Sequence, residues 1–307
     1  MYVIKHVPED FVVTEVSTVR ALSSGKYAYF VLLKRNVTTL EALRRLAVAL
    51  RVSFGGLSCA GNKDKKAVTG QVCSVYDGSK DRLESLNLRD INCRFLGFGD
   101  EPVHIGQLEG NAFKIVVRNI DSIPEISPKF RNLFGEQRFS VNNAHIGRHI
   151  VKREFEPAVK LISGLHPEIV AKMKLHTGTR DFVGALRCLP RKLLLLFVHA
   201  YQSLLWNKIA LASSAEILPI VGFGTEVDDS MRGILAEENL KPSDFVIREL
   251  PEASAEGSER KVWAEAKDLK VGSLEGDEFF VGKKKVTLEF FLPKGCYATE
   301  FIRQQFQ

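Results

Sequence analysis

The spacing of apolar side chains divides the chain into a strand-rich start, a helical middle and a strand-rich end. Apolar and polar residues alternate over 11–16, and 27–33 is rich in aromatic and branched residues, so both stretches predict β-strands. After Thr38, apolar residues recur at helical spacing as far as about Val52, which predicts an amphipathic helix with Thr38 and Thr39 at its cap. Further strands are predicted over 72–76, 92–98 and 113–118.

The middle of the chain follows a different pattern. Residues 129–192 have helical spacing and an excess of cations, and 193–212 predicts the longest helix. Residues 227–259 are acidic and rich in loop-forming side chains, and 75–88 is predicted to be a polar connection. The strand pattern returns over 276–292, with the three lysines at 283–285 at a turn between two strands.

Composition limits the classes of protein to which the chain can belong. With 307 residues, 45% of them hydrophobic, we expect a globular protein with one large or two medium domains. The formal net charge of +6 favours an anionic partner such as nucleic acid. The five cysteines lack zinc-ligand spacing and are odd in number, so we expect no metal site, no disulfide framework and a reducing cytoplasm. We also expect no signal peptide and no membrane span, because no apolar run is long enough.

The richest candidate chemistry lies in residues 58–71. Gly61 and Asn62 form a turn signal between two strand-like runs, and Asp64 follows on that turn among Lys63, Lys65 and Lys66. Neighbouring cations keep a carboxylate ionised, which suits a nucleophile or an electrostatic stabiliser better than a general acid. The segment lacks the glycine spacing of a phosphate loop. For an arbitrary sequence of this kind, a solvated lysine-aspartate turn would be the simpler interpretation.

The motif Gly-Asn-Lys-Asp-Lys-Lys-Ala-Val-Thr-x-Gln over 61–71 resembles the signature of the TruD pseudouridine synthases. Other motifs of that family follow in the same order and cover nearly the whole chain. They are a basic residue, Lys5, ahead of Pro-Glu-Asp-Phe-x-Val-x-Glu at 8–15, Gly-Asn-x-Phe at 110–113, Asn-x-Phe-Gly-x-Gln-Arg-Phe at 132–139, Ala-x-Gln-Ser-x-x-Trp-Asn at 200–207 and Gly-x-Tyr-Ala-Thr-x-x-x-Arg at 295–303. One mild departure is Leu133, where the family more often has an aromatic residue.

The resemblance implies an α+β fold with a mixed, mostly antiparallel sheet and flanking helices. The catalytic domain would comprise 1–129 and 267–307, and a largely α-helical domain would be inserted at 130–266. The implied activity is isomerisation of uridine to pseudouridine in tRNA, at position 13. That reaction uses no cofactor or metal, and we expect a cytoplasmic monomer whose partner is tRNA.

The resemblance also implies roles for single residues. Asp64 would be the nucleophile, and Lys5 would hold it ionised. A flipped-out base would be framed by five further residues, namely Phe11, Lys63, Asn111, Phe113 and Tyr297. Without the resemblance, Phe11 and Phe113 would be read as core aromatics and Asn111 as a turn residue.

Cations early in the predicted insertion are candidate RNA contacts, namely Arg138, Arg148, Lys152 and Arg153. For Arg138, an internal ion pair is an equally good interpretation. His145 and His149 have i,i+4 spacing, but without a third ligand they do not indicate a metal site. Two other functions stay open: an RNA-acting glycosidase that releases uracil, and an RNA-binding protein without catalysis.

Overall fold

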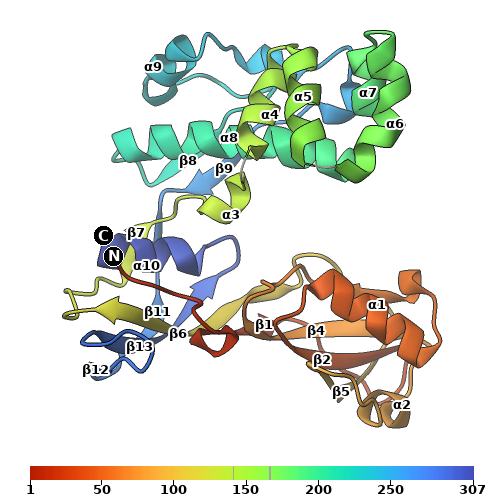
Figure 1. Ribbon diagram of the computed structural model, residues 1–307, viewed down its shortest axis with the longest axis vertical. Helices are drawn as coiled ribbons and strands as arrows, with labels where there is room; N and C mark the ends of the chain where they lie inside the picture. The colour runs from red at the N-terminus through yellow and green to blue at the C-terminus, as the bar shows by residue number, and fades with distance from the viewer. Residues whose placement is uncertain (141, 166) are drawn as a thin grey trace. The chain divides into compact units, whose positions relative to one another are not determined.

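The computed structural model describes residues 1–140, 142–165 and 167–307. Its chain divides into two compact units (Figure 1). The first comprises Met1–Phe130, Glu265–Ala298 and Ile302–Gln307, and the second comprises Arg131–Ala264 together with Thr299–Phe301.

The first unit is built on one mixed, mostly antiparallel sheet. Its path runs β11-β13-β6-β1-β4-β2-β5, with β12 added beside β13 and β3 beside β4. Only the β1–β4 pair of this sheet is parallel among the pairings described. The strands are β1 Phe11–Ser17, β2 Tyr27–Arg35, β3 Leu57–Cys59, β4 Val68–Tyr76, β5 Ile91–Gly99, β6 Leu108–Ile120, β11 Lys267–Val271, β12 Glu275–Gly276 and β13 Lys284–Pro293.

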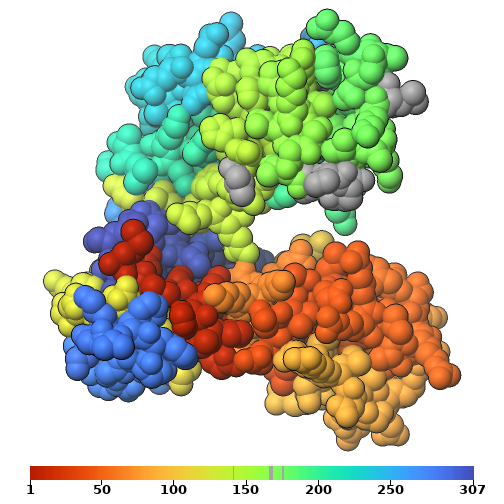
Figure 2. Space-filling model, viewed as in Figure 1, coloured from red at the N-terminus to blue at the C-terminus, as the bar shows by residue number. Residues whose placement is uncertain are grey.

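Segments from the two ends of the chain adjoin within this unit. In Figure 2 the red N-terminal atoms lie against blue atoms of the C-terminal part. The rings of His6 and Phe279 have centroids 4.7 Å apart, and those of Tyr2 and Phe306 are 5.8 Å apart. Arg118 on β6 binds the buried Asp10 of the short helix η1 Pro8–Asp10 through both Nε and Nη2. These contacts fix the residues that precede β1, including Lys5.

The helix predicted after Thr38 is confirmed as α1 Thr39–Leu50. Thr38 caps it by accepting a hydrogen bond from the Glu41 amide, and Arg51 ends it in the left-handed conformation. Its buried face includes Leu43, Leu46 and Leu50, which belong to the same core as strand residues of β2.

The first unit also contains α2 Lys80–Glu84 and α10 Ala298–Phe306. Helix α10 crosses the boundary between the units. The polar connection predicted over 75–88 was wrong at the end of β4 and at α2, because Val75 and Leu83 are buried and Ser79 caps the helix.

The second unit is mainly helical. Its longest helix, α8, runs through a core that includes Phe197, Tyr201 and Trp206, all fully buried. The prediction of loops over 227–259 was wrong at α9, which Asp228 caps and which buries Met231 and Leu235. The helices are α3 Glu136–Phe139, α4 Asn143–Val151, α5 Phe155–Leu165, α6 Pro167–Gly178, α7 Phe182–Arg187, α8 Arg191–Ala212 and α9 Asp229–Glu237, with the short turns η3 Pro242–Phe245 and η4 Pro251–Ala253. Short strands are β8 Ile217–Ile220 and β9 Ser258–Lys261, while β7 Lys129–Arg131 and β10 Trp263–Glu265 span the boundary between the units.

Two of the sequence motifs meet inside the second unit. Asn207 on α8 both donates to the Phe134 carbonyl at 2.9 Å and accepts from the Phe134 amide at 2.8 Å. Gln202 is buried and donates to the Val221 carbonyl at 2.8 Å. These polar side chains therefore satisfy backbone groups within the unit.

Strand β6 begins earlier than the sequence indicated. Gly110 and Asn111 lie inside it rather than on a turn before it. A side chain at Gly110 would place its Cβ 2.1 Å from the Leu292 carbonyl oxygen of β13, so this glycine permits close strand approach instead of a turn. As a result, Asn111 occupies a fixed register position opposite Glu15 of β1.

Candidate active site

The candidate nucleophile lies on the loop between the antiparallel strands β3 and β4. The Lys5 ammonium is 2.6 Å from Oδ2 of Asp64 and 4.0 Å from the centroid of the Phe11 ring. Their side chains are 21% and 18% exposed, so a molecule from solvent can reach this ion pair. Lys5 adopts a left-handed backbone conformation, with φ of 57°, just before the turn fixed by Pro8. The structure thus brings together the two residues that the sequence assigned to catalysis.

Aromatic side chains of three neighbouring strands form a cluster next to this ion pair. Val13 of β1 is opposite Phe113 of β6, which is opposite Phe290 of β13. The Phe113 ring stacks on Phe290 with centroids 5.5 Å apart, and it meets Phe11 edge-on at 6.0 Å. Phe11 and Phe113 are therefore close together, but both are buried in the sheet's core. Phe290 was not predicted to be a site residue, because it lies in none of the motifs that carry the resemblance.

A chain of polar contacts joins three strands and the motif loop. The Lys63 ammonium donates to Oδ1 of Asn111 at 2.7 Å and lies 2.8 Å from Oε2 of Glu15. The other Glu15 oxygen accepts from the Val72 amide at 3.1 Å, and the Glu15 side chain has no exposed surface. Because Lys63 occupies the amide oxygen of Asn111, the amide nitrogen is the group that Asn111 can offer to a carbonyl of a base.

Glu15 is a site residue to which sequence reasoning gave no role. It lies within the quoted motif at 8–15, and its position shares a strand face with Phe11 and Val13. A carboxylate on the inward face of a strand is unusual unless it is paired. The position of Glu15 on the same strand face as two apolar residues was the signal in the sequence that it is buried and paired. Only the structure shows that its partner is Lys63.

Buried polar side chains also anchor the backbone of the motif loop. Thr39 at the start of α1 accepts from the Lys63 amide at 2.9 Å and donates to Gln71 at 3.0 Å. Gln71 on β4 donates to the Gly61 carbonyl at 2.8 Å. Lys34 on β2 donates to the Asp64 carbonyl at 2.7 Å. Three points of the loop are thus fixed by side chains of three different elements.

Tyr297 lies in the segment that follows β13. This strand ends with Pro293 opposite Gly110, one residue before Asn111, and the Lys294 amide donates to the Glu109 carbonyl at 2.9 Å. The segment therefore leaves the sheet beside the start of β6, and Tyr297 itself is the cap residue of α10. A contact of Tyr297 with a target base stays a prediction.

Comparison with known proteins gives a consistent result. A family model described as "tRNA pseudouridine synthase D (TruD)" matches residues 2–172, 165–221 and 213–305. The chain belongs to the TruD family. Members of this family are named as tRNA pseudouridine synthases, which are isomerases that act on tRNA.

TruD relatives match over almost the full chain. A protein of Thermococcus onnurineus named "Probable tRNA pseudouridine synthase D" is 30% identical, over 98% of this chain and 94% of its own. The "tRNA pseudouridine synthase D" of Aquifex aeolicus is 27% identical, over 99% and 97%. A crystal structure of a TruD protein from Methanosarcina mazei superimposes with a TM-score of 0.75 at 26% identity, covering 98% of this chain and 92% of that one. This match confirms the α+β pseudouridine synthase fold.

The four cations of the second unit that are candidate RNA contacts differ in the hydrogen bonds that they form within the protein. Arg138 donates to the Ser203 hydroxyl at 3.3 Å, and Arg148 pairs with Glu238 at 3.2 Å. The Arg153 guanidinium donates to the carbonyls of Val151, Asp244 and Val246. These bonds give the three arginines structural roles within the unit.

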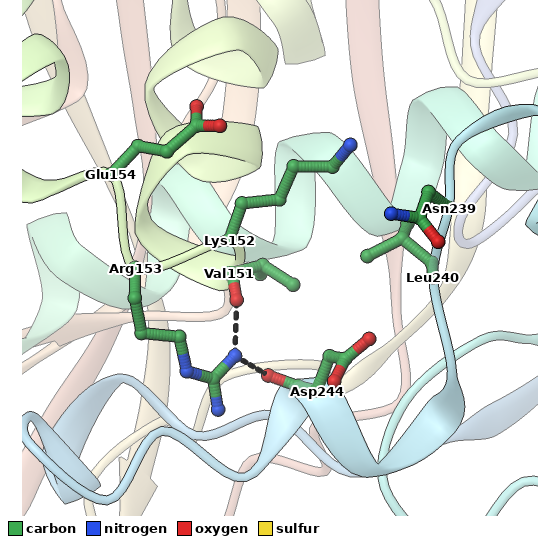
Figure 3. A pocket seen from close by; sticks show the side chains of 7 residues that line it. All are labelled: Val151, Lys152, Arg153, Glu154, Asn239, Leu240 and Asp244. Atoms are coloured by element: carbon green, nitrogen blue, oxygen red, sulfur yellow. Dashed lines mark hydrogen bonds between the residues drawn. The ribbon is translucent and has the colours of Figure 1, made fainter.

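Lys152 lines a pocket of about 310 Å³ in the same unit. Figure 3 shows the Arg153 guanidinium turned toward Asp244, while the Lys152 side chain extends in another direction. The remaining lining residues include Glu154, Asn239 and Leu240. Of the four proposed cations, Lys152 is therefore the one best placed to meet an external phosphate.

The described part of the chain contains neither a metal-binding cluster nor a membrane-spanning helix. No group of three or more His, Cys, Asp or Glu side chains there could hold a metal ion. None of the helices described has both the length and the apolar character needed to cross a bilayer.

Proposed function

We propose that this TruD-family chain converts uridine to pseudouridine in tRNA, at position 13, with Asp64 as the nucleophile. The observation that carries the proposal is the Lys5–Asp64 ion pair, set beside Phe11 and Phe113 on a loop whose Lys63 reaches Asn111. A solvated turn would not need an ion-paired carboxylate that is only 18% exposed and three backbone anchors. The family membership supports the same reaction.

The reaction needs the groups that this site provides. The bond between C1′ of the ribose and N1 of uracil breaks, the base turns, and a bond from C1′ to C5 forms. The proton on C5 is lost and N1 gains one, so the mass of the RNA does not change. The Asp64 carboxylate can attack or stabilise the electron-poor sugar or base, and the Lys5 ammonium, 2.6 Å from its Oδ2, orients it. The Asn111 amide nitrogen can donate to a uracil carbonyl while the base is out of its helix.

The direct test is single-turnover reaction of excess protein with a uridine-labelled tRNA transcript, followed by nucleoside analysis. We expect pseudouridine from the natural chain and none from Asp64→Asn, which keeps the side chain's size but removes the nucleophilic oxygen. Affinity for tRNA should stay within about threefold. Substantial turnover by Asp64→Asn would refute the nucleophile, and release of free uracil would show that the chain is a glycosidase instead.

The same proposal includes the organisation of the molecule. We propose that residues 130–266 form a domain inserted into a catalytic domain made of 1–129 and 267–307. The monomeric state, the cytoplasmic location and the independence from cofactors stay predictions from the sequence.

A further inference from the structure

Lys34 is a charged side chain buried in the core of the first unit. It lies on β2, only 2% exposed, where burial alone would favour an apolar residue. Its ammonium donates to the carbonyls of Val37 and Asp64, each at 2.7 Å. In the described part of the chain, no carboxylate oxygen forms an ion pair with it, so two carbonyl dipoles stabilise its charge.

The two bonds join the end of β2 to the motif loop. Asp64 is thus held at both its ends, because Lys5 contacts its carboxylate and Lys34 its carbonyl oxygen. The other anchors, Thr39 and Gln71, are neutral and bind the loop at Lys63 and Gly61. Lys34 is the anchor that acts on the peptide of Asp64 itself.

We propose that Lys34 is a positioning residue for the reaction, which fixes the Asp64 peptide through a charged hydrogen bond and so aims the carboxylate at the substrate. The inference rests on the proposed function of Asp64. Because Lys34 is buried, it acts through Asp64 and not by direct contact with the substrate. Charged hydrogen bonds are stronger and better oriented than neutral ones, which is what a nucleophile on a loop requires.

The protonation of Lys34 makes this role sensitive to pH. The pKa of Lys34 is lowered to about 8, because the lowering by burial, the largest cause, and by repulsion from Lys63 outweighs the attraction by Asp64 that raises it. These two are the charged groups of the motif loop that face it, and Thr39 and Val37 on the α1 side are neutral. As pH rises through about 8, the ammonium becomes an amine with weaker hydrogen bonds and no attraction for Asp64. The rate of the chemical step should therefore fall over that range.

Folding stability should respond in the opposite direction. The folded-state pKa lies below the ordinary lysine value of 10.5, so between these values the unfolded chain binds more protons than the folded one. The free energy of unfolding of the natural chain, relative to Lys34→Met, should therefore rise as pH increases from about 8 to about 10.5. A loss of activity with a gain in stability over the same range separates positioning from simple unfolding.

The experiment compares Lys34→Met, Lys34→Arg and the natural chain in single-turnover reactions with tRNA at pH 6.5 to 9.5. Lys34→Met should lose about 10- to 100-fold in rate constant at pH 7, the value of a hydrogen bond to a charged group, with tRNA affinity within about twofold. Lys34→Arg, which stays protonated, should lack the decline centred near pH 8. The exposed Lys26, which precedes β2, gives a control variant, Lys26→Met, with the same charge change and an unaltered rate.

Each outcome decides the proposal. A Lys34→Met rate within twofold of the natural rate would overturn it. The proposal would also be overturned if the loss of rate in Lys34→Met disappeared at 15 °C, well below the melting temperature, because the effect would then be one of stability alone. If Lys34→Arg does not fold, amide exchange in Lys34→Met carries the test: exchange at 61–67 should be faster, and unchanged exchange there would overturn the proposal. Absence of pseudouridine with the natural chain would instead refute the proposed function.

Discussion

At the scale of single residues, the site depends on charges that the fold has removed from water. Glu15 and Lys34 are both buried, and each binds a different part of the motif loop. Glu15 is paired with the Lys63 side chain, whereas Lys34 binds the Asp64 backbone. Burying such groups is costly unless they are hydrogen-bonded, so their presence indicates that the loop must adopt one conformation.

Glu15→Gln tests the importance of this arrangement. Glutamine keeps the acceptor for the Val72 amide but leaves Lys63 without its ionic partner. We expect the free energy of unfolding to fall by about 1–3 kcal/mol, and the single-turnover rate to fall at least about tenfold because Lys63 no longer holds Asn111. Urea unfolding and nucleoside analysis measure the two effects. A variant with natural activity would show that Lys63 does not need Glu15 for its position.

At the scale of secondary-structure elements, the site is positioned by the register of β1, β6 and β13. Gly110 lets β6 and β13 approach at the point where Asn111 must face Glu15. This register aligns the Phe113 and Phe290 rings two residues further along the strands than the Asn111–Leu292 pair. The sheet therefore fixes side chains that are far apart in sequence.

Gly110→Ala should disturb that register. The new Cβ would lie 2.1 Å from the Leu292 carbonyl oxygen, a backbone atom that cannot move without breaking the ladder. We expect a loss of about 1–3 kcal/mol in stability, the usual cost of overpacking, together with reduced pseudouridine formation. Gly276→Ala is the matched control, because no atom lies within 4 Å of its added Cβ. Equal melting temperatures for the two variants would contradict this account of β6.

Three helices of the second unit are linked through Glu238 at the end of α9. It accepts from Arg148 of α4 at 3.2 Å and from Lys208 and Tyr201 of α8 at 2.6 and 3.1 Å. Burial raises the Glu238 pKa, but the hydrogen bonds from Lys208 and Arg148 outweigh burial and lower it to about 2. This network explains why Arg148 is occupied within the unit.

The lowered pKa predicts how stability depends on acid. The folded-state pKa lies below the ordinary value of 4.5, so the stabilisation is complete above that value and is lost as pH falls from about 4.5 through about 2. Chemical unfolding of the natural chain and of Glu238→Gln at pH 5, 4 and 3 should show the difference between them shrinking as pH falls. A constant difference would mean that the carboxylate charge does not contribute.

At the scale of the whole molecule, a formal net charge of +6 favours an anionic partner, and tRNA is the proposed one. The two units differ in what they contribute to that proposal. The first contains the candidate catalytic residues, and the second contains the four cations proposed to bind RNA. Three of those cations form hydrogen bonds within their unit, so charge alone does not identify an RNA contact.

Lys152→Glu tests the remaining cation. If Lys152 neutralises a phosphate, the variant should bind all tRNAs more weakly, and the slope of log affinity against log salt should flatten by about one unit. The control is Lys241→Glu, an exposed lysine in the acidic stretch 227–259, with the same change in net charge. Binding titrations at several salt concentrations give the result. An equal effect of both variants would indicate long-range charge rather than contact at Lys152.

The sequence by itself determined the elements with strong periodicity and the family motif that contains Asp64. The helix after Thr38 and the strands at β1, β2 and β5 follow from local hydrophobic spacing, which depends on neighbours in the chain. The pairing of Lys5 with Asp64 followed from the family motifs, because both residues belong to motifs quoted for the resemblance. Weakly periodic elements such as α2 and α9 were missed, since each rests on a cap and one or two buried side chains.

Only the tertiary structure decided which polar groups are partners. Gly110 and Asn111 look like a turn in sequence, but pairing with Pro293 and Leu292 of β13, almost two hundred residues away, makes them part of a strand. Lys34 carries no motif signal, because its partner is a backbone oxygen supplied by a distant loop. Arg148 and Arg153 resemble a basic surface until Glu238 and the carbonyls near Asp244 are brought against them. In each case the deciding contact joins residues far apart in the chain. The local sequence around one of them does not indicate which distant residue is its partner.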